Sequence, residues 1–306
     1  MAERFSGVLG SDVTGVILLA ENKYCGIHQG TSAGKPVIFK QYKTEDDKLA
    51  RLEAEGISFY HSIASERETL IDSKVLGYDA AQKIIAISFV PGARLSDFLR
   101  SVAGSRDRWA EGVHAMEVLG SFLSEMRSRT KREGEPLDPF HFEYLRYASG
   151  RLASLPIVGS VFFRNALIEA EGLIDRISTS GISASMAHGD FVLRNIHIDG
   201  AKVGVIDFAN TIKASSPLND LCNLWQGLEN MFLPAEFRSL LWEGVARGFG
   251  SMPFDEAEEQ FFHEYHRRRW LMLNWKTGDP RRWLKAVRGM MTFAKPWESG
   301  VGVIAK

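Results

Sequence analysis

The 306-residue sequence has few cysteines, no long apolar run and almost no net charge. Its two cysteines, Cys25 and Cys222, are too few for a disulfide framework, which favours reduced thiols in a cytoplasmic protein. The N-terminus lacks a signal-peptide pattern, and the longest apolar run, near residues 84–90, is far shorter than the roughly 20 residues that span a bilayer. A net charge of −1 provides no general attraction to nucleic acid. We therefore expect neither a membrane span nor a nucleic-acid partner.

The first 90 residues have the pattern of a small antiparallel sheet with one helix. Short β-prone segments are separated by turn residues, which is typical of a meander. Thr44 is the predicted N-cap of the helix, and the acidic residues after it suit the positive end of the helix dipole. The Pro91-Gly92 pair should end the last strand. The predicted strands are residues 14–20, 23–30, 36–42, 73–79 and 83–90, and the predicted helix is residues 44–64.

The remainder of the chain is mainly helical, with one strand-rich island at residues 186–208. The sequence thus predicts an α+β fold with an N-terminal lobe at residues 1–90 and a larger, mainly helical lobe at residues 91–306. A sheet lobe, a hinge and a helical lobe with an embedded hairpin, in that order, suggest a two-lobed, kinase-like architecture.

The strand-rich island contains the residues that point to chemistry. Asp190 and Asn195 lie on a loop that enters a strand, and Asp199-Gly200 predicts a hairpin turn that returns the chain to Asp207. Phosphoryl transfer requires oxygen ligands for Mg²⁺ and a separate carboxylate that orients the attacking hydroxyl. We assign Asp190 to the hydroxyl and Asn195 and Asp207 to Mg²⁺. The alternative is that both aspartates only cap turns of an ordinary hairpin.

The motif HGD-x4-N at residues 188–195, followed by IDF at residues 206–208, resembles the aminoglycoside phosphotransferase and choline kinase family, which shares the protein-kinase-like fold. Asp220 resembles the downstream aspartate of that family. Strong motif identity covers residues 186–222, while the order of the lobes agrees over most of the chain. Phe208 is followed by Ala209 and not by glycine, which argues against a mobile switch at this point.

The resemblance also implies a nucleotide site. Lys40 resembles the strand lysine that holds the α- and β-phosphates, although a solvated lysine is the alternative. Its partner should be Glu55 or Glu53 on the next helix, and the pattern favours Glu55. The loop at residues 20–24, which should cover the nucleotide, contains no glycine. The backbone groups expected to meet the base belong to Ser88, Phe89 and Val90.

Two further residues of the motif have roles that the resemblance does not decide. Arg194 stands either near the transferred phosphate or in solvent. His188 is interpreted as a structural hydrogen-bonding residue and not as a general base.

The charge is unevenly distributed near the C-terminus. Residues 201–260 carry 4 Lys/Arg against 9 Asp/Glu, whereas residues 261–306 carry 10 against 3. One interpretation is helix electrostatics, with Asp255 and the glutamates after it opening a helix that Arg267–Arg269 close. The other is a cationic patch, which includes Arg281 and Arg282, for an anionic or glycan acceptor or an anionic membrane surface. Such a patch would disfavour polycationic antibiotics.

We therefore expect a phosphotransferase that moves the γ-phosphoryl group of ATP or GTP to a hydroxyl of a small molecule or glycan. A sugar-type acceptor is favoured, and an anionic or lipid-linked acceptor would fit the basic stretch. The alternatives are a nucleotide-binding pseudokinase that acts as an interaction module, an aminoglycoside-type antibiotic kinase and a protein kinase. The complete set of motif residues argues against the first, and the absent glycine-rich loop argues against the last.

Overall fold

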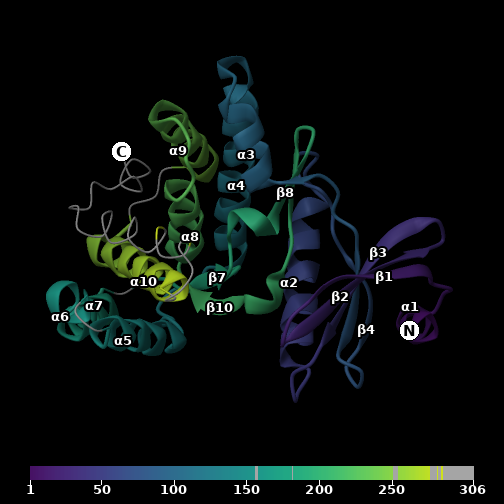
Figure 1. Ribbon diagram of the computed structural model, residues 1–306, viewed down its shortest axis with the longest axis horizontal. Coiled ribbons are helices and arrows are strands. Elements are labelled where there is room, and N and C mark those ends of the chain that lie inside the picture. Colours follow the sequence, from purple (N-terminus) through teal and green to yellow (C-terminus); the bar gives the residue numbers. More distant parts are fainter. Residues whose placement is uncertain (156–157, 181, 251–253, 276–280, 282–283, 285–306) are drawn as a thin grey trace. The chain divides into compact units, whose positions relative to one another are not determined.

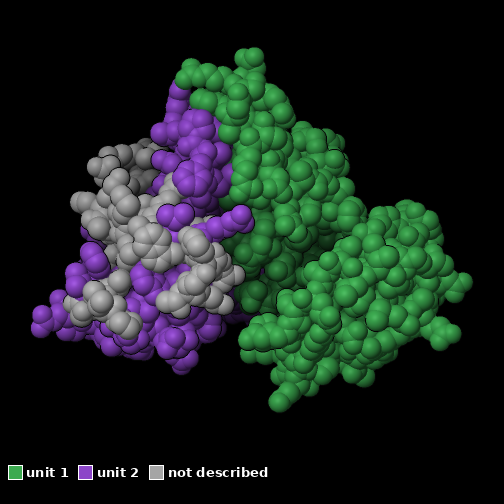
Figure 2. Space-filling model, viewed as in Figure 1, with its two compact units in different colours: residues 1–118, 188–211 green, residues 119–187, 212–306 purple. Residues whose placement is uncertain are grey.

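The computed structural model describes residues 1–155, 158–180, 182–250, 254–275, 281 and 284 (Figure 1). The chain divides into two compact units, which Figure 2 shows in different colours. Unit 1 comprises residues 1–118 and 188–211, and unit 2 comprises residues 119–187 and 212–306. The hairpin with the candidate site therefore belongs to the same unit as the N-terminal sheet. The predicted lobe boundary after residue 90 stays a prediction.

Unit 1 contains the predicted five-stranded antiparallel sheet, with the strand order β1-β2-β3-β5-β4. Tight turns join β1 to β2, β2 to β3 and β4 to β5, whereas β3 pairs with β5 across the segment that contains α2 and β4. The strands are β1 Thr14–Glu21, β2 Cys25–Ser32, β3 Lys35–Tyr42, β4 Val75–Asp79 and β5 Ile84–Ser88.

Two helices pack on the two faces of this sheet (Figure 1). Helix α1, Ala2–Leu9, was not predicted, and its buried Phe5 stacks on Phe39 of β3 with ring centroids 4.3 Å apart. Helix α2, Lys48–Ala64, was predicted, but its start at Thr44 was wrong. The Thr44 hydroxyl donates to the Asp46 carbonyl and so closes a local turn before the helix begins.

The rest of unit 1 contains a second, three-stranded sheet of order β6-β8-β9. The predicted hairpin is confirmed: Asp199 pairs with Lys202, and Gly200 takes the left-handed conformation with φ 60° that the turn needs. Short 3-10 helices cover residues 106–108, 193–195 and 208–210. The remaining elements are β6 Ala93–Arg94, α3 Leu95–Ala103, β8 Ile196–Asp199 and β9 Lys202–Val205.

Unit 2 is mainly helical, and a small core of Leu152, Phe163, Ala166 and Leu271 joins three of its helical segments. Asp255 caps the last described helix by accepting a hydrogen bond from the Ala257 amide, as predicted. No helix in the described part of the chain is both long and apolar enough to cross a membrane. The elements are α4 Trp109–Thr130 (shared with unit 1), α5 Phe140–Ala153, α6 Val158–Phe162, α7 Ala166–Thr179, β7 Ser185–Ala187, β10 Ile212–Ser215, α8 Pro217–Glu229, α9 Ala235–Phe249 and α10 Glu256–Asn274.

Helix α2 approaches the segment after β9 very closely at Gly56. A Cβ atom on Gly56 would lie 2.5 Å from the Phe208 Cβ and 2.9 Å from the Thr211 hydroxyl oxygen. We expect Gly56→Ala to destabilise the protein by about 1–3 kcal/mol through overpacking. This sign is opposite to the usual effect in a helix interior, where alanine is better than glycine by roughly 1 kcal/mol. Urea unfolding of the two proteins measures the difference.

Gly172, in the interior of α7, is the matched control, because a Cβ there would meet nothing within 4 Å. Gly172→Ala should therefore raise the free energy of unfolding by about 0.5–1 kcal/mol. Effects of the same sign in both variants would contradict the close approach at Gly56.

Candidate functional site

Lys40 on β3 is a buried cation held between two carboxylates. Lys40 is 5% exposed, and its Nζ atom lies 2.8 Å from Glu53 Oε1 and 2.9 Å from Asp207 Oδ1. Burial lowers the pKa of Lys40, but the two carboxylates raise it by more, so that its pKa lies above the ordinary lysine value. The alternative of a solvated strand lysine is thereby excluded.

The structure contradicts the predicted pairing of Lys40 with Glu55. Glu53 makes the contact and is fully buried, whereas the Glu55 side chain is 43% exposed and lies 4.0 Å from Arg51. Residues two apart on a helix point about 200° apart, so only one of the two glutamates can face Lys40. Glu53 lies one turn before Gly56, where α2 comes closest to Phe208, and this contact decides the register.

Tyr42 is a fourth member of this cluster, after Lys40, Glu53 and Asp207, and the sequence reasoning missed it. Its hydroxyl donates to Glu53 Oε2 at 2.9 Å, so both carboxylate oxygens of Glu53 have a buried partner. Burial and the Glu53 charge raise the pKa of Tyr42, which keeps the hydroxyl protonated as a donor. The strand period of two was the available signal, since Lys40 and Tyr42 lie on the same face of β3.

The two glutamates of α2 give a matched test of this ion pair. Glu53→Gln should destabilise the protein by up to about 3–5 kcal/mol, because Lys40 then keeps only the more exposed Asp207 as an anionic partner. Glu55→Gln, the same chemical change on the exposed side, should alter stability by no more than about 0.5 kcal/mol. Chemical denaturation of both variants measures these values, and similar losses in the two would show that the Glu53 contact is unimportant.

The loop after β7 holds Asp190 in a network of its own. The Asn195 amide donates to the Asp190 backbone carbonyl at 2.9 Å and to its Oδ2 at 3.2 Å. Arg194 Nη2 donates to the same Oδ2 at 2.8 Å. The Arg194 side chain is 64% exposed, whereas that of Asp190 is 8% exposed. Asp190 is thus oriented by its neighbours in the motif.

His188 uses both ring nitrogens to hold this loop together. A carbonyl can only accept, so His188 Nε2 carries the proton donated to the Ile206 carbonyl at 3.0 Å. Nδ1 is then the acceptor for the Asp190 amide at 3.3 Å. The ring also lies 4.5 Å from that of Phe208. These contacts agree with the structural interpretation of His188.

Asp207 lies at the point where β9 leaves the hairpin, and its backbone is unusual. Its φ of 71° and ψ of 59° place a non-glycine residue in the left-handed region, which costs about 1–2 kcal/mol. Such strain is concentrated at functional sites. Burial raises the pKa of Asp207, but the charge of Lys40 and its hydrogen bond, with a smaller contribution from Arg194, bring its pKa below the ordinary carboxyl value. The side chain is therefore ionised at neutral pH.

Lys40, Arg194, Asn195 and Asp207 line a cavity of about 310 Å³ within unit 1, a volume in the range of small-ligand sites. Its wall from the first sheet is mostly apolar, while Lys40, Asn195 and Asp207 supply polar groups. The complete lining is Leu19, Ala20, Ile27, Ile38, Lys40, Ile87, Ser88, Phe89, Val90, Arg94, Arg194, Asn195, His197, Ile206 and Asp207.

The two backbone segments that the sequence assigned to the nucleotide lie at or near this cavity. Of the three predicted base-contacting residues, Ser88 has its amide engaged with the Lys74 carbonyl at 3.0 Å, so Phe89 and Val90 are the better candidates. The glycine-free turn between β1 and β2 is held by Asn22, whose Oδ1 accepts hydrogen bonds from the amides of Tyr24 and Cys25. The Asn22 side chain thus stabilises a turn that contains no glycine.

The predicted cationic patch near the C-terminus is wrong for Arg267 and Arg268, which are buried in unit 2. Arg268 Nη2 lies 2.9 Å from Glu169 Oε2, and Arg267 Nη1 lies 3.6 Å from Glu264 Oε1. The simpler helix-end interpretation is also wrong in detail, because α10 continues to Asn274 beyond these arginines. Arg281 is exposed, and Arg282 lies outside the described residues.

Comparison with solved structures finds the same fold over most of the chain. A thermostable mutant of the aminoglycoside phosphotransferase APH(4)-Ia, in its apo form, matches with TM-score 0.63 and 13% identity over 97% of this chain and 100% of that chain. The amicoumacin kinase hAmiN matches with TM-score 0.63 and 15% identity over 94% and 91% of the two chains. A putative fructosamine-3-kinase from Thermobifida fusca YX-ER1 matches with TM-score 0.59 and 17% identity over 95% and 97%.

At these identities the likeness shows the fold, and it confirms the predicted α+β, protein-kinase-like architecture. The sequence matches none of the curated proteins with which it was compared. The model of the phosphotransferase enzyme family, in contrast, matches residues 28–262. This range includes Lys40, Asp190, Asn195 and Asp207. The chain therefore belongs to the phosphotransferase enzyme family.

Proposed function

We propose that this chain transfers the γ-phosphoryl group of ATP to a hydroxyl of a sugar-type small molecule, with Asp190 as the residue that orients the hydroxyl and accepts its proton. The observation that carries the proposal is the arrangement inside unit 1. Lys40, Asn195 and Asp207 line one cavity, and Asn195 links that cavity to Asp190. A carboxylate within hydrogen-bonding reach of the reacting hydroxyl is what general base catalysis requires. GTP is the alternative donor.

Asn195 and Asp207 are suited to hold Mg²⁺, since they offer one amide oxygen and one ionised carboxylate at the same cavity. Asn195 donates its two hydrogen bonds through Nδ2, which leaves Oδ1 as its ligand atom. Among the described residues no group of three or more His, Cys, Asp or Glu is arranged for a metal. A pair that relies on phosphate oxygens for further ligands is the usual arrangement for Mg²⁺. The ion would supply neutralisation of phosphate charge.

The protein's own cations have distinct tasks in this proposal. Lys40 is buried and held by Glu53, so it is preorganised to bind phosphate oxygens, with no need to reorganise when the nucleotide enters. Arg194 lines the same cavity while its guanidinium contacts Asp190. It therefore fixes the Asp190 carboxylate and places a positive charge beside the position of phosphoryl transfer.

The acceptor can be tested directly by measuring ADP release from Mg²⁺ and ATP. The panel should contain neutral sugars, a polycationic aminoglycoside, choline and a nucleoside, each at equal concentration. The matched control is Asp190→Asn, which keeps the size of the side chain but removes the base. Acceptor-dependent ADP release with a neutral sugar, lost in the variant, supports the proposal. Release with the aminoglycoside alone would reject the sugar preference, and release that is unchanged in Asp190→Asn would reject the role of Asp190.

A cytoplasmic location is part of the same proposal. Both cysteines are buried and free, and burial raises the pKa of the Cys25 thiol to about 11. Such thiols are unreactive and agree with a reducing compartment.

A further inference from the structure

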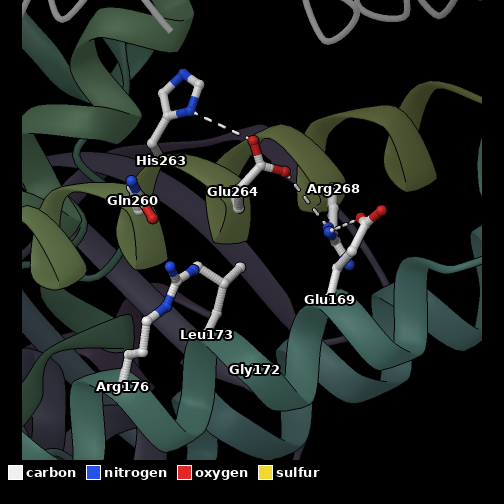
Figure 3. Close-up of a pocket in the computed structure, with 8 residues that line it drawn as sticks. All are labelled: Glu169, Gly172, Leu173, Arg176, Gln260, His263, Glu264 and Arg268. Carbon is white, nitrogen blue, oxygen red and sulfur yellow. Dashed lines mark hydrogen bonds and ion pairs between the residues drawn. The ribbon is translucent and has the colours of Figure 1, made fainter. Parts of the chain in front are cut away.

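A second cavity, of about 430 Å³, lies within unit 2 between α7 and α10 (Figure 3). All residues assigned above to phosphoryl transfer belong to unit 1, so this cavity is formed by a separate set of side chains. Its volume falls in the range of small-molecule sites. The lining residues are Glu169, Gly172, Leu173 and Arg176 from α7, and Gln260, His263, Glu264 and Arg268 from α10.

Gly172 is the first indication that this space accommodates a ligand. It lies in the middle of α7, where glycine costs roughly 1 kcal/mol relative to alanine. No packing requires it, because an added Cβ would meet nothing within 4 Å. Its backbone conformation is also one that any residue can adopt, since its φ is not in the left-handed range. The backbone at Gly172 therefore borders open space beside the cavity.

Glu264 is the second indication, because its carboxylate is only loosely held. Three side-chain nitrogens lie near it, Arg268 Nε, Arg267 Nη1 and His263 Nδ1, at 3.5, 3.6 and 3.6 Å, beyond the usual 2.7–3.2 Å of an N–H···O hydrogen bond. Glu264 Oε2 is buried and accepts no hydrogen bond from the described residues. A buried acceptor without a donor is unfavourable unless a ligand or water supplies one.

The charges of the lining limit the ligand class. Glu169 and Arg268 form an ion pair at 2.9 Å, which leaves the loosely held Glu264 carboxylate and the exposed Arg176 as opposite charges. In Figure 3 the Arg176 side chain extends from α7 toward α10. Burial lowers the pKa of His263 to about 4, so its ring is neutral at pH 7. Two carboxylates and two guanidinium groups balance, which disfavours both polyanions and polycations.

We propose that the α7–α10 cavity is a binding site for a neutral, polyhydroxylated small molecule of the sugar class. Each hydroxyl of a sugar both donates and accepts, so one molecule can donate to Glu264 and accept from Arg176 and Gln260. Leu173 offers an aliphatic surface for the C–H face of the ring. The site does not depend on the assignment of Asp190, because it is built from other residues in the other unit.

The test is titration calorimetry of the full-length protein with maltose and glucose as neutral probes. Glucosamine, glucose 6-phosphate and glutamine serve as cationic, anionic and zwitterionic comparisons. Gly172→Trp should fill the clearance and weaken sugar binding at least tenfold, while Gly172→Ala keeps the space and should bind like the wild type. Arg176→Ala, an exposed position, should weaken binding about tenfold through loss of a charged hydrogen-bond donor. ATP binding should be the same in all variants and reports correct folding.

A coupled ADP assay then distinguishes two roles that the bound sugar can have. A bound sugar that is phosphorylated is the acceptor, and a bound sugar that is not phosphorylated is a separate effector; either result supports the site. The proposal is overturned if no neutral sugar binds, if the charged or zwitterionic probes bind more tightly, or if Gly172→Trp and Arg176→Ala both bind sugar as the wild type does. Loss of catalysis in Asp190→Asn with sugar binding retained would show that the two proposals succeed or fail independently.

Discussion

Asp190→Asn should lower turnover by about 10²–10⁴-fold while leaving the affinity for Mg²⁺ and ATP nearly unchanged. Asp190 is proposed to contact the acceptor hydroxyl, and its described contacts are with the protein: the Asn195 amide, the Arg194 guanidinium and His188. Asparagine has the same shape but cannot accept the proton of the hydroxyl. Steady-state ADP release gives turnover, and calorimetry gives nucleotide affinity.

Asp199→Asn is the control for this prediction, because Asp199 is an exposed aspartate in the same hairpin, paired with Lys202. Asp199→Asn should change neither the turnover nor the affinity for Mg²⁺ and ATP. Turnover in Asp190→Asn within twofold of the wild type would remove Asp190 from the mechanism. A large loss of ATP affinity in the same variant would instead place Asp190 in the nucleotide site.

The hairpin that carries the site was readable from the sequence because its signals are local. The Asp199-Gly200 turn, the alternation of apolar residues and the spacing from Asp190 to Asp207 determine the register of β8 and β9 within a short segment. His188 could be interpreted for the same reason, since its partners Asp190 and Ile206 lie in that segment. Short-range patterns thus predicted the centre of the site.

The choice between Glu53 and Glu55 was not readable, because tertiary packing decides it. Both glutamates suit a helix that follows a lysine-bearing strand, and they differ only in direction. The direction is set where Gly56 meets Phe208, a contact between residues far apart in the chain. A local pattern contains no information about such a contact. Tyr42 shows the same limit, since only its partner Glu53 makes it part of the site.

The arginines of α10 show why a charge count along the chain is a poor guide to a surface. Ten basic residues against three acidic ones suggest a patch. Arg268, however, is 1% exposed and is neutralised by Glu169, which lies 99 positions earlier. A buried guanidinium needs a carboxylate and hydrogen-bond acceptors, and α5 and α7 supply them to the two terminal nitrogens of Arg268. For Arg267 and Arg268, the local excess of charge in the sequence therefore does not correspond to a charged surface.

Asp207→Asn should abolish Mg²⁺-dependent ATP binding while the protein stays folded. The substitution removes the only carboxylate that we assign to the metal. Asparagine is the informative replacement, because it tolerates the left-handed backbone of Asp207 better than alanine does. Asp207→Ala would add backbone strain, and a loss of binding could then reflect local misfolding. Calorimetric titration of ATP with and without Mg²⁺ measures the effect.

The pH dependence and the crossed comparison with Asp190 make this prediction specific. The pKa of Asp207 in the folded protein lies below the ordinary carboxyl value. The side chain is therefore charged at any pH above the ordinary carboxyl pKa, and it loses this charge only as the pH falls through the lowered pKa. Mg²⁺-dependent affinity should thus be constant between about pH 6 and pH 8, well above ordinary carboxyl pKa values. Asp190→Asn should keep that affinity and lose turnover, whereas Asp207→Asn should lose the affinity itself. If Asp207→Asn bound ATP with the same Mg²⁺ dependence as the wild type, Asp207 would be only an ion-pair partner of Lys40, and the metal would have to be held by other groups.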